Sequence, residues 1–82
     1  MDRKTYLITG AGTGFGKGIA LSLAEVGEEV IAGVETMSEV SMLLLEAKEK
    51  KLNLRVEKLD ITEALDRERA GKWDVDVLLN NA

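Results

Sequence analysis

Apolar residues recur along the chain with two alternating periods, and this alternation predicts a β-α-β-α-β-α-β order. Strands are expected at the short β-branched, aromatic or continuously apolar runs, residues 5–9, 29–34, 53–59 and 75–79. Helices are expected where apolar residues follow a helical spacing, at 15–26, 38–51 and 62–70. Because helices between strands favour right-handed parallel crossovers, we expect an α/β domain with a four-stranded parallel sheet in the order 3-2-1-4. Two helices should cover one face of the sheet and the short third helix the other.

Residues that start or stop helices support these bounds. Ser38 and Thr62 are the expected caps of the second and third helices, and Gly27 and Gly71 end the first and third. Each longer helix is expected to bury one apolar stripe against the sheet. The first stripe consists of Ile19, Ala20, Leu23, Ala24 and Val26, and the second of Val40, Leu43, Leu44 and Ala47.

Composition removes several classes of protein. The chain has 82 residues, which is one small domain spanning 1–82, and it contains no Cys, His or Pro. These absences exclude a disulfide framework, a thiolate zinc site and a Ser-His or Cys-His catalytic pair, and no metal site is expected. The net charge of -4, without a basic run, argues against nucleic acid or an anionic membrane as partner. No apolar stretch approaches the ~20 residues of a membrane span, and the start of the chain does not resemble a secretory leader, so a cytoplasmic location is expected.

The strongest chemical signal is the glycine-rich segment 10–16, which follows the first strand and opens the first helix. Backbone N–H groups at a helix N-terminus bind phosphate, and glycine lets the anion approach the backbone closely. The segment does not fit a Walker A loop, because Ala11 and Gly18 replace the first glycine and the hydroxyl residue of that motif. It does not fit G-x-G-x-x-G either, because position 15 is Phe. It fits T-G-x-x-x-G-x-G, with Thr9, Gly10, Gly14 and Gly16.

Two further motifs lie at strand ends. Residues 59–62 read Leu-Asp-Ile-Thr after the third strand, and residues 80–82 read Asn-Asn-Ala after the fourth. Together with the glycine loop, in this order, they resemble the N-terminal part of the short-chain dehydrogenase/reductase family. The resemblance covers residues 5–82. It implies half of a Rossmann domain that binds the dinucleotide NAD or NADP as part of an oxidoreductase.

The resemblance also implies roles for individual residues. The loop would surround the diphosphate mainly through its backbone, Asp60 and Ile61 would lie at the adenine, and Asn81 with Ala82 would line the ribose side. An acid about 20 residues beyond the loop is typical of ribose binding. Glu35 lies there, one position beyond the family's usual acid position at Val34, and its charge favours NAD. Lys17 keeps NADP as the alternative. The candidate cofactor site is Gly10, Thr13, Gly14, Phe15, Gly16, Glu35, Asp60, Ile61, Asn81 and Ala82.

The family's catalytic residues are expected to lie outside this chain. The resemblance implies a Ser, a Tyr and a Lys beyond the fourth strand, whereas the only tyrosine here is Tyr6, in the first strand. We therefore expect a nucleotide-binding part that is inactive alone. It should self-associate through an uncovered fourth strand and apolar surface around Val75, Val77 and Leu79. Two alternatives stay open: an engineered or truncated folding scaffold without useful ligand binding, and an oxidoreductase completed by another chain.

Overall fold

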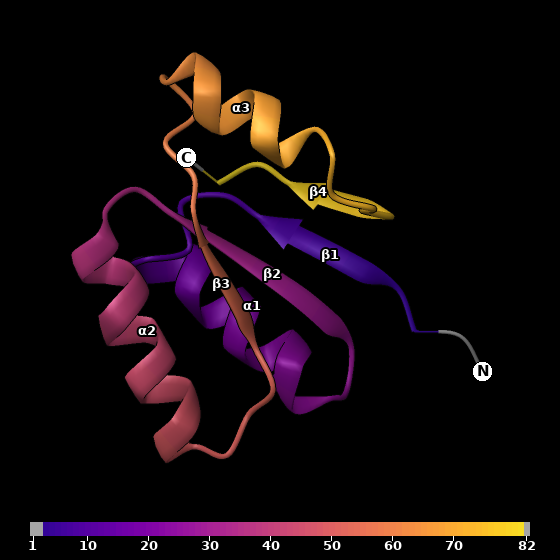
Figure 1. Cartoon of the computed structure of the whole chain (residues 1–82). Coiled ribbons are helices and arrows are strands. Elements are labelled where there is room, and N and C mark those ends of the chain that lie inside the picture. Colours follow the sequence, from indigo (N-terminus) through magenta and orange to yellow (C-terminus); the bar gives the residue numbers. More distant parts are fainter. Residues whose placement is uncertain (1–2, 82) are drawn as a thin grey trace.

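Parallel strands and helices alternate along the chain in the computed structural model, which describes residues 3–81. The strands are β1 (Thr5–Ile8), β2 (Glu29–Val34), β3 (Arg55–Lys58) and β4 (Val77–Leu79), and the helices are α1 (Gly14–Glu25), α2 (Met37–Glu49) and α3 (Ala64–Ala70). The sheet order is β3-β2-β1-β4, and each pair of neighbours is parallel. The expected α/β fold and strand order are thus confirmed (Figure 1).

Side chains alternate between the two faces of the strands and build a core on each face of the sheet. On the face that carries α1 and α2, the buried residues are Ile8, Val30, Ala32, Val34, Ala20, Leu43 and Ala47. On the other face, the connection between α3 and β4 covers the sheet, and the packed residues are Leu7, Ile31, Leu59, Ala70, Trp73 and Val75. Figure 1 shows α1 and α2 on one side of the sheet and α3 on the other. The central strand β2 is therefore buried from Val30 to Val34, as its continuous apolar run predicts.

The N-terminal ends of α2 and α3 differ from the expected ones. Thr36, not Ser38, caps α2: its Oγ1 accepts a hydrogen bond from the Glu39 N–H at 3.1 Å, and Glu39 Oε1 accepts one from the Thr36 N–H at 3.2 Å. The Ser38 prediction is wrong because the T-x-x-E pair forms a reciprocal capping box two residues earlier. The Thr62 prediction is also wrong. Glu63 is the capping position of α3, without a side-chain cap, and the Thr62 hydroxyl instead donates to Asp60 Oδ1 at 2.6 Å.

Both long helices end in the same type of turn. After α1, Gly27 has a φ of 92°, its N–H donates to the Ala24 carbonyl, and the next N–H donates to the Leu23 carbonyl. This pattern is a Schellman motif, in which glycine is the favoured residue. Lys51 takes the equivalent position after α2 with a φ of 58°, although a side chain is disfavoured there. The expected stop at Gly27 is confirmed, and the turn after α2 shows that the same geometry forms without glycine.

The buried stripes of α1 and α2 are narrower than their apolar residues predict. In α2, Leu43 is buried whereas Leu44 is 45% exposed. Consecutive helical residues point about 100° apart, so only one of these two leucines faces the sheet. Ile19 of α1 and Val26, which directly follows that helix, are likewise exposed. Placing these three residues in the buried stripes is therefore wrong, and the close contacts are made by smaller neighbours such as Ala20 and Ala47.

A charged cluster anchors α3 to the end of β3. The side chain of Asp66 is only 8% exposed, and its carboxylate accepts hydrogen bonds from Lys58 Nζ at 2.8 Å, the Asp60 N–H at 2.9 Å and Arg69 at 3.3 Å. The hydrogen bond from Lys58, followed by that from the Asp60 backbone, lowers the pKa of Asp66 to about 2. Hydrogen bonds to Asp66 and then Glu63 raise the pKa of Lys58 to about 12. The short helix α3 is thus held by a buried carboxylate as well as by apolar packing.

Candidate functional site

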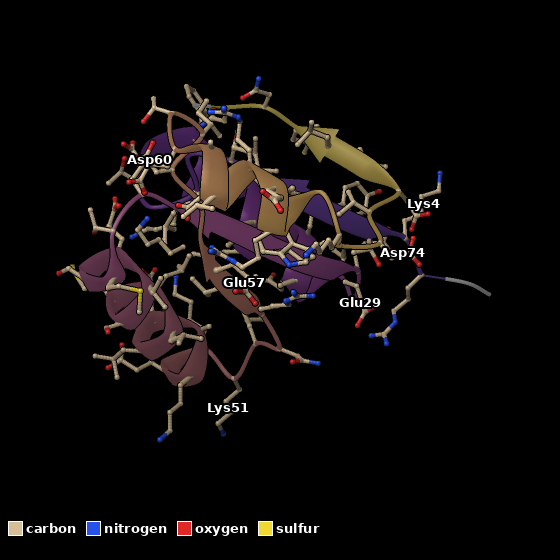
Figure 2. All side chains as sticks on the ribbon, turned by 45° about the horizontal axis from the view of Figure 1, so that its top comes forward. Lys4, Glu29, Lys51, Glu57, Asp60 and Asp74 are labelled. Carbon is tan, nitrogen blue, oxygen red and sulfur yellow. The ribbon has the colours of Figure 1, made fainter. Side chains whose placement is uncertain are left out.

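The glycine-rich loop lies at the carboxyl edge of the sheet, between β1 and α1. Its backbone is hydrogen-bonded on both sides: the Thr9 N–H donates to the Leu79 carbonyl of β4, and the Ala11 N–H donates to the Gly33 carbonyl of β2, each at 3.0 Å. Figure 2 shows Asp60, which follows β3, far from Lys4 and Glu29, which lie at the opposite edge where β1 and β2 begin. The loop therefore lies at the edge where open parallel sheets bind ligands.

Three glycines of the loop are required for two different reasons. Gly10 and Gly14 have φ values of 63° and 59°, which favour glycine over residues with a side chain. Gly16 is required because the chain approaches it closely. A Cβ placed there would lie 2.4 Å from the Gly10 carbonyl oxygen and 2.6 Å from Asn81 Nδ2. These requirements explain the spacing of the glycines and keep the backbone exposed around the start of α1.

Within the described part of the chain, the N-terminal end of α1 is not capped by a side chain. Thr13 occupies the capping position with extended backbone, but its side chain makes no capping hydrogen bond, and the first turn contains no acidic residue. The first N–H groups of a helix lack partners within the helix and carry partial positive charge. This end of α1 is consequently free to bind an anion, in contrast to α2, whose first turn is closed by Thr36 and Glu39.

A threonine and two asparagines connect the loop to the chain after β4. The Thr9 hydroxyl donates to Asn80 Oδ1 at 2.9 Å and accepts from the Asn81 N–H at 3.0 Å. Asn81 Nδ2 donates to the Gly10 carbonyl at 3.3 Å. The structure thus brings Asn81 together with the loop, as the candidate site requires. Ala82 lies outside the described residues.

One acid that contacts the loop, Glu39, is absent from the candidate residues predicted from the sequence. Glu35 is exposed, and its N–H donates to Glu39 Oε1 at 3.1 Å. Glu39 Oε2 lies against the loop, since a Cβ placed on Gly12 would be 2.2 Å from this atom. The signal in the sequence was the T-x-x-E spacing of Thr36 and Glu39, which predicts a capping box and hence a carboxylate folded back on the β2–α2 connection.

The remaining candidate residues make local contacts. Asp60 Oδ1 accepts from both the N–H and the hydroxyl of Thr62, and these hydrogen bonds lower the pKa of Asp60. The carbonyl of the exposed Ile61 accepts from Arg67 at 2.8 Å. The side chain of Phe15, in the first turn of α1, is 85% exposed. Lys17, the cation that kept NADP as an alternative, is paired instead with Glu46 of α2 at 2.9 Å.

Residues 4–82 match the family model described as short chain dehydrogenase. The chain belongs to the short-chain dehydrogenase family. This assignment accounts together for the T-G-x-x-x-G-x-G loop, the strand order and the Asn-Asn segment that the structure places against the loop.

Individual relatives of this short-chain dehydrogenase chain are longer proteins. It is 31% identical to the 3-oxoacyl-[acyl-carrier-protein] reductase of Buchnera aphidicola and 36% identical to the NADP-dependent 3-hydroxy acid dehydrogenase of Schizosaccharomyces pombe, in each case over 100% of this chain and 35% of the relative. A solved actinorhodin polyketide ketoreductase with NADPH superimposes with a TM-score of 0.84 at 28% identity, covering 99% of this chain and 33% of the ketoreductase. The chain therefore spans about a third of the length of these relatives and corresponds to their N-terminal, Rossmann-like part.

Two further properties concern metals and membranes. Within residues 3–81, no group of three His, Cys, Asp or Glu side chains is arranged to hold a metal ion. In the same range, no helix is both long and apolar enough to cross a bilayer.

Proposed function

We propose that this chain binds the adenosine diphosphate part of NAD or NADP and thereby supplies the nucleotide-binding part of an oxidoreductase. The observation that supports this most is the uncapped N-terminal end of α1. The adjoining loop is rich in glycine, and a glycine has no side chain of its own to cover its backbone. A diphosphate fits this chemistry, because unpaired N–H groups and the helix dipole stabilise negative charge. The short-chain dehydrogenase relatives whose names include NADP or NADPH support the same ligand class.

The proposed contacts follow the carboxyl edge of the sheet. The loop residues Gly10, Thr13, Gly14, Phe15 and Gly16 surround the diphosphate through their backbone. Asp60 and Ile61 lie at the adenine, Asn81 and Ala82 line the ribose side, and Glu35 stands at the outer end of β2. Bound nicotinamide dinucleotide supplies hydride transfer, whereas the residues of this chain bind and orient the nucleotide.

Titration of the 15N-labelled chain with NAD tests this proposal. The amide signals of residues 10–16 are expected to shift, because their N–H groups contact the diphosphate, and the signals of α3 are expected to stay in place. ADP-ribose should reproduce the shifts, and nicotinamide mononucleotide, which lacks the adenosine, should give weaker ones. Absence of shifts at residues 10–16 with millimolar NAD would refute the proposal and favour a folding scaffold without a ligand.

We propose in addition that the chain self-associates through β4. Among the described strands, β4 pairs only with β1, so its other edge presents unpaired N–H and C=O groups. The exposed apolar residue is not one of those expected. Val75 and Leu79 pack against the two cores, whereas the side chain of Leu78 is 58% exposed. An apolar side chain beside an open strand edge favours pairing with a second copy.

Sedimentation measures this association directly. The chain is expected to form dimers or larger species as its concentration rises, whereas Leu78→Lys should remain monomeric, because a charged edge residue opposes pairing. Leu45→Lys is the control and should still associate, because Leu45 is equally exposed, at 58%, but lies in α2, which packs on β3 and β2 rather than on β4. A chain that stays monomeric at high concentration would rule out this interface.

A further inference from the structure

The Glu39 side chain lies between two parts of the site. Its Oε1 atom accepts hydrogen bonds from the N–H groups of Glu35 and Thr36, at 3.1 and 3.2 Å, and is thereby fixed to the end of β2. Its carboxyl group lies over Gly12, where an added Cβ would be 2.2 Å from Oε2 and 3.4 Å from Cγ. Among the described residues, the hydrogen bonds of this carboxylate all involve Oε1, so Oε2 remains an acceptor next to the loop.

This position matters for the ribose of a bound nucleotide. With a diphosphate at the start of α1, the adenosine extends over the loop toward the carboxyl end of β2, where an acid binds the ribose hydroxyls in folds of this type. Glu35 follows β2 directly, and its backbone N–H donates a hydrogen bond to Glu39. Glu39 is therefore the carboxylate that the structure fixes between the loop and β2.

We propose that Glu39, in the first turn of α2, is the residue that selects a nucleotide with a free 2′-hydroxyl and disfavours one with a 2′-phosphate. This inference rests on the proposed nucleotide binding. Oε2 accepts a hydrogen bond from a ribose hydroxyl, whereas a 2′-phosphate brings two negative charges beside a carboxylate that the capping box prevents from turning away. The capping box thus has a second role, which is to hold the selecting charge over Gly12.

Glu39→Gln is a suitable variant, because glutamine at this position still completes a capping box and keeps the size of the side chain. We expect the stability of the chain to be unchanged and its affinity for NADP, relative to NAD, to rise about tenfold, the size expected for removing a nearby like charge. The preference of the unmodified chain for NAD should also shrink at high ionic strength, since screening weakens the repulsion. Glu49→Gln, at the opposite end of the same helix, is the matched control, because Glu49 is exposed and lies outside the proposed contacts; it should leave the ratio of the two affinities unchanged.

The outcomes separate the two proposals. If the unmodified chain binds neither nucleotide, the proposed function fails and this inference fails with it. If the chain binds nucleotides but Glu39→Gln leaves the affinity ratio unchanged, or Glu49→Gln changes it to the same extent, only the role of Glu39 is refuted. The geometry has a test without ligand: nuclear Overhauser effects are expected between the α-protons of Gly12 and the γ-protons of Glu39. Their absence would overturn the assignment.

Discussion

Replacing Gly16 with alanine is expected to destabilise the fold by about 1–3 kcal/mol, the usual cost of an overpacked site. The new methyl group would lie 2.4 Å from the Gly10 carbonyl oxygen, which is backbone and cannot turn aside, and 2.6 Å from Asn81 Nδ2. Relief of the clash must separate α1 from the loop or break the hydrogen bond of Asn81. The variant should therefore also lose the NAD-dependent shifts of the loop amides.

Gly18→Ala is the matched control, because it makes the same substitution two residues later in the same helix. A Cβ at Gly18 meets no heavy atom within 4 Å. Alanine should stabilise the helix there by about 0.5–1 kcal/mol, since it restricts the unfolded chain more than glycine does. Urea unfolding measures both variants. Equal stability of the two would contradict the close approach at Gly16.

Removing the carboxylate of Asp66 is expected to lower the melting temperature by several degrees. In Asp66→Ala, the side chain of Lys58 and the N–H of Asp60 lose a partner at a site that is only 8% exposed at Asp66. Breaking one side of such a pair costs more than the pair contributes, because the remaining groups stay desolvated. Circular dichroism melting curves measure this loss. The exposed Asp74, shown in Figure 2, provides the control Asp74→Ala, which should melt near the unmodified chain.

The same cluster determines how stability depends on pH. The pKa of Asp66 is about 2 in the folded chain against an ordinary value of 3.8, so its contribution is present above that ordinary value and is lost as the pH falls toward 2. The pKa of Lys58 is raised from 10.5 to about 12, so its contribution is present below 10.5 and is lost as the pH rises through 12. Asp66→Asn should flatten the acid side of the stability profile. An acid side as steep as that of the unmodified chain would refute the assignment to Asp66.

Much of the fold follows from local patterns in the sequence. The strands of the sheet are read from short apolar runs, and right-handed crossovers then leave few possible strand orders. Helix ends were predicted less well where two capping residues compete. Ser38 and Thr36 both have capping side chains, and only the contact with Glu39 decides between them. Leu44 illustrates a similar limit, because the angle at which α2 lies on the sheet determines which of two neighbouring leucines is buried.

The candidate site could be predicted from sequence as far as its backbone. Glycine spacing indicates where a loop must turn or approach another segment. Gly10 and Gly14 have the positive φ values of such a turn, and Gly16 lies at the close approach. Side-chain partners were not predictable in the same way. The pairing of Lys17 with Glu46 and the contact of Glu39 with Gly12 join residues on different elements, and a linear pattern does not record them.

The hydroxyl of Thr9 has a consequence for the order of events during synthesis. It pairs with Asn80 and Asn81, residues 71 and 72 positions further along, so the turn at the start of the loop lacks these restraints until that segment has left the ribosome and docked. A nascent chain that ends after β2 contains every glycine of the loop. It still lacks the hydrogen bond that Asn81 donates to the Gly10 carbonyl. Nucleotide capture should accordingly begin only after Asn80 and Asn81 have been made and have docked, and a bound nucleotide should in turn slow the detachment of β4.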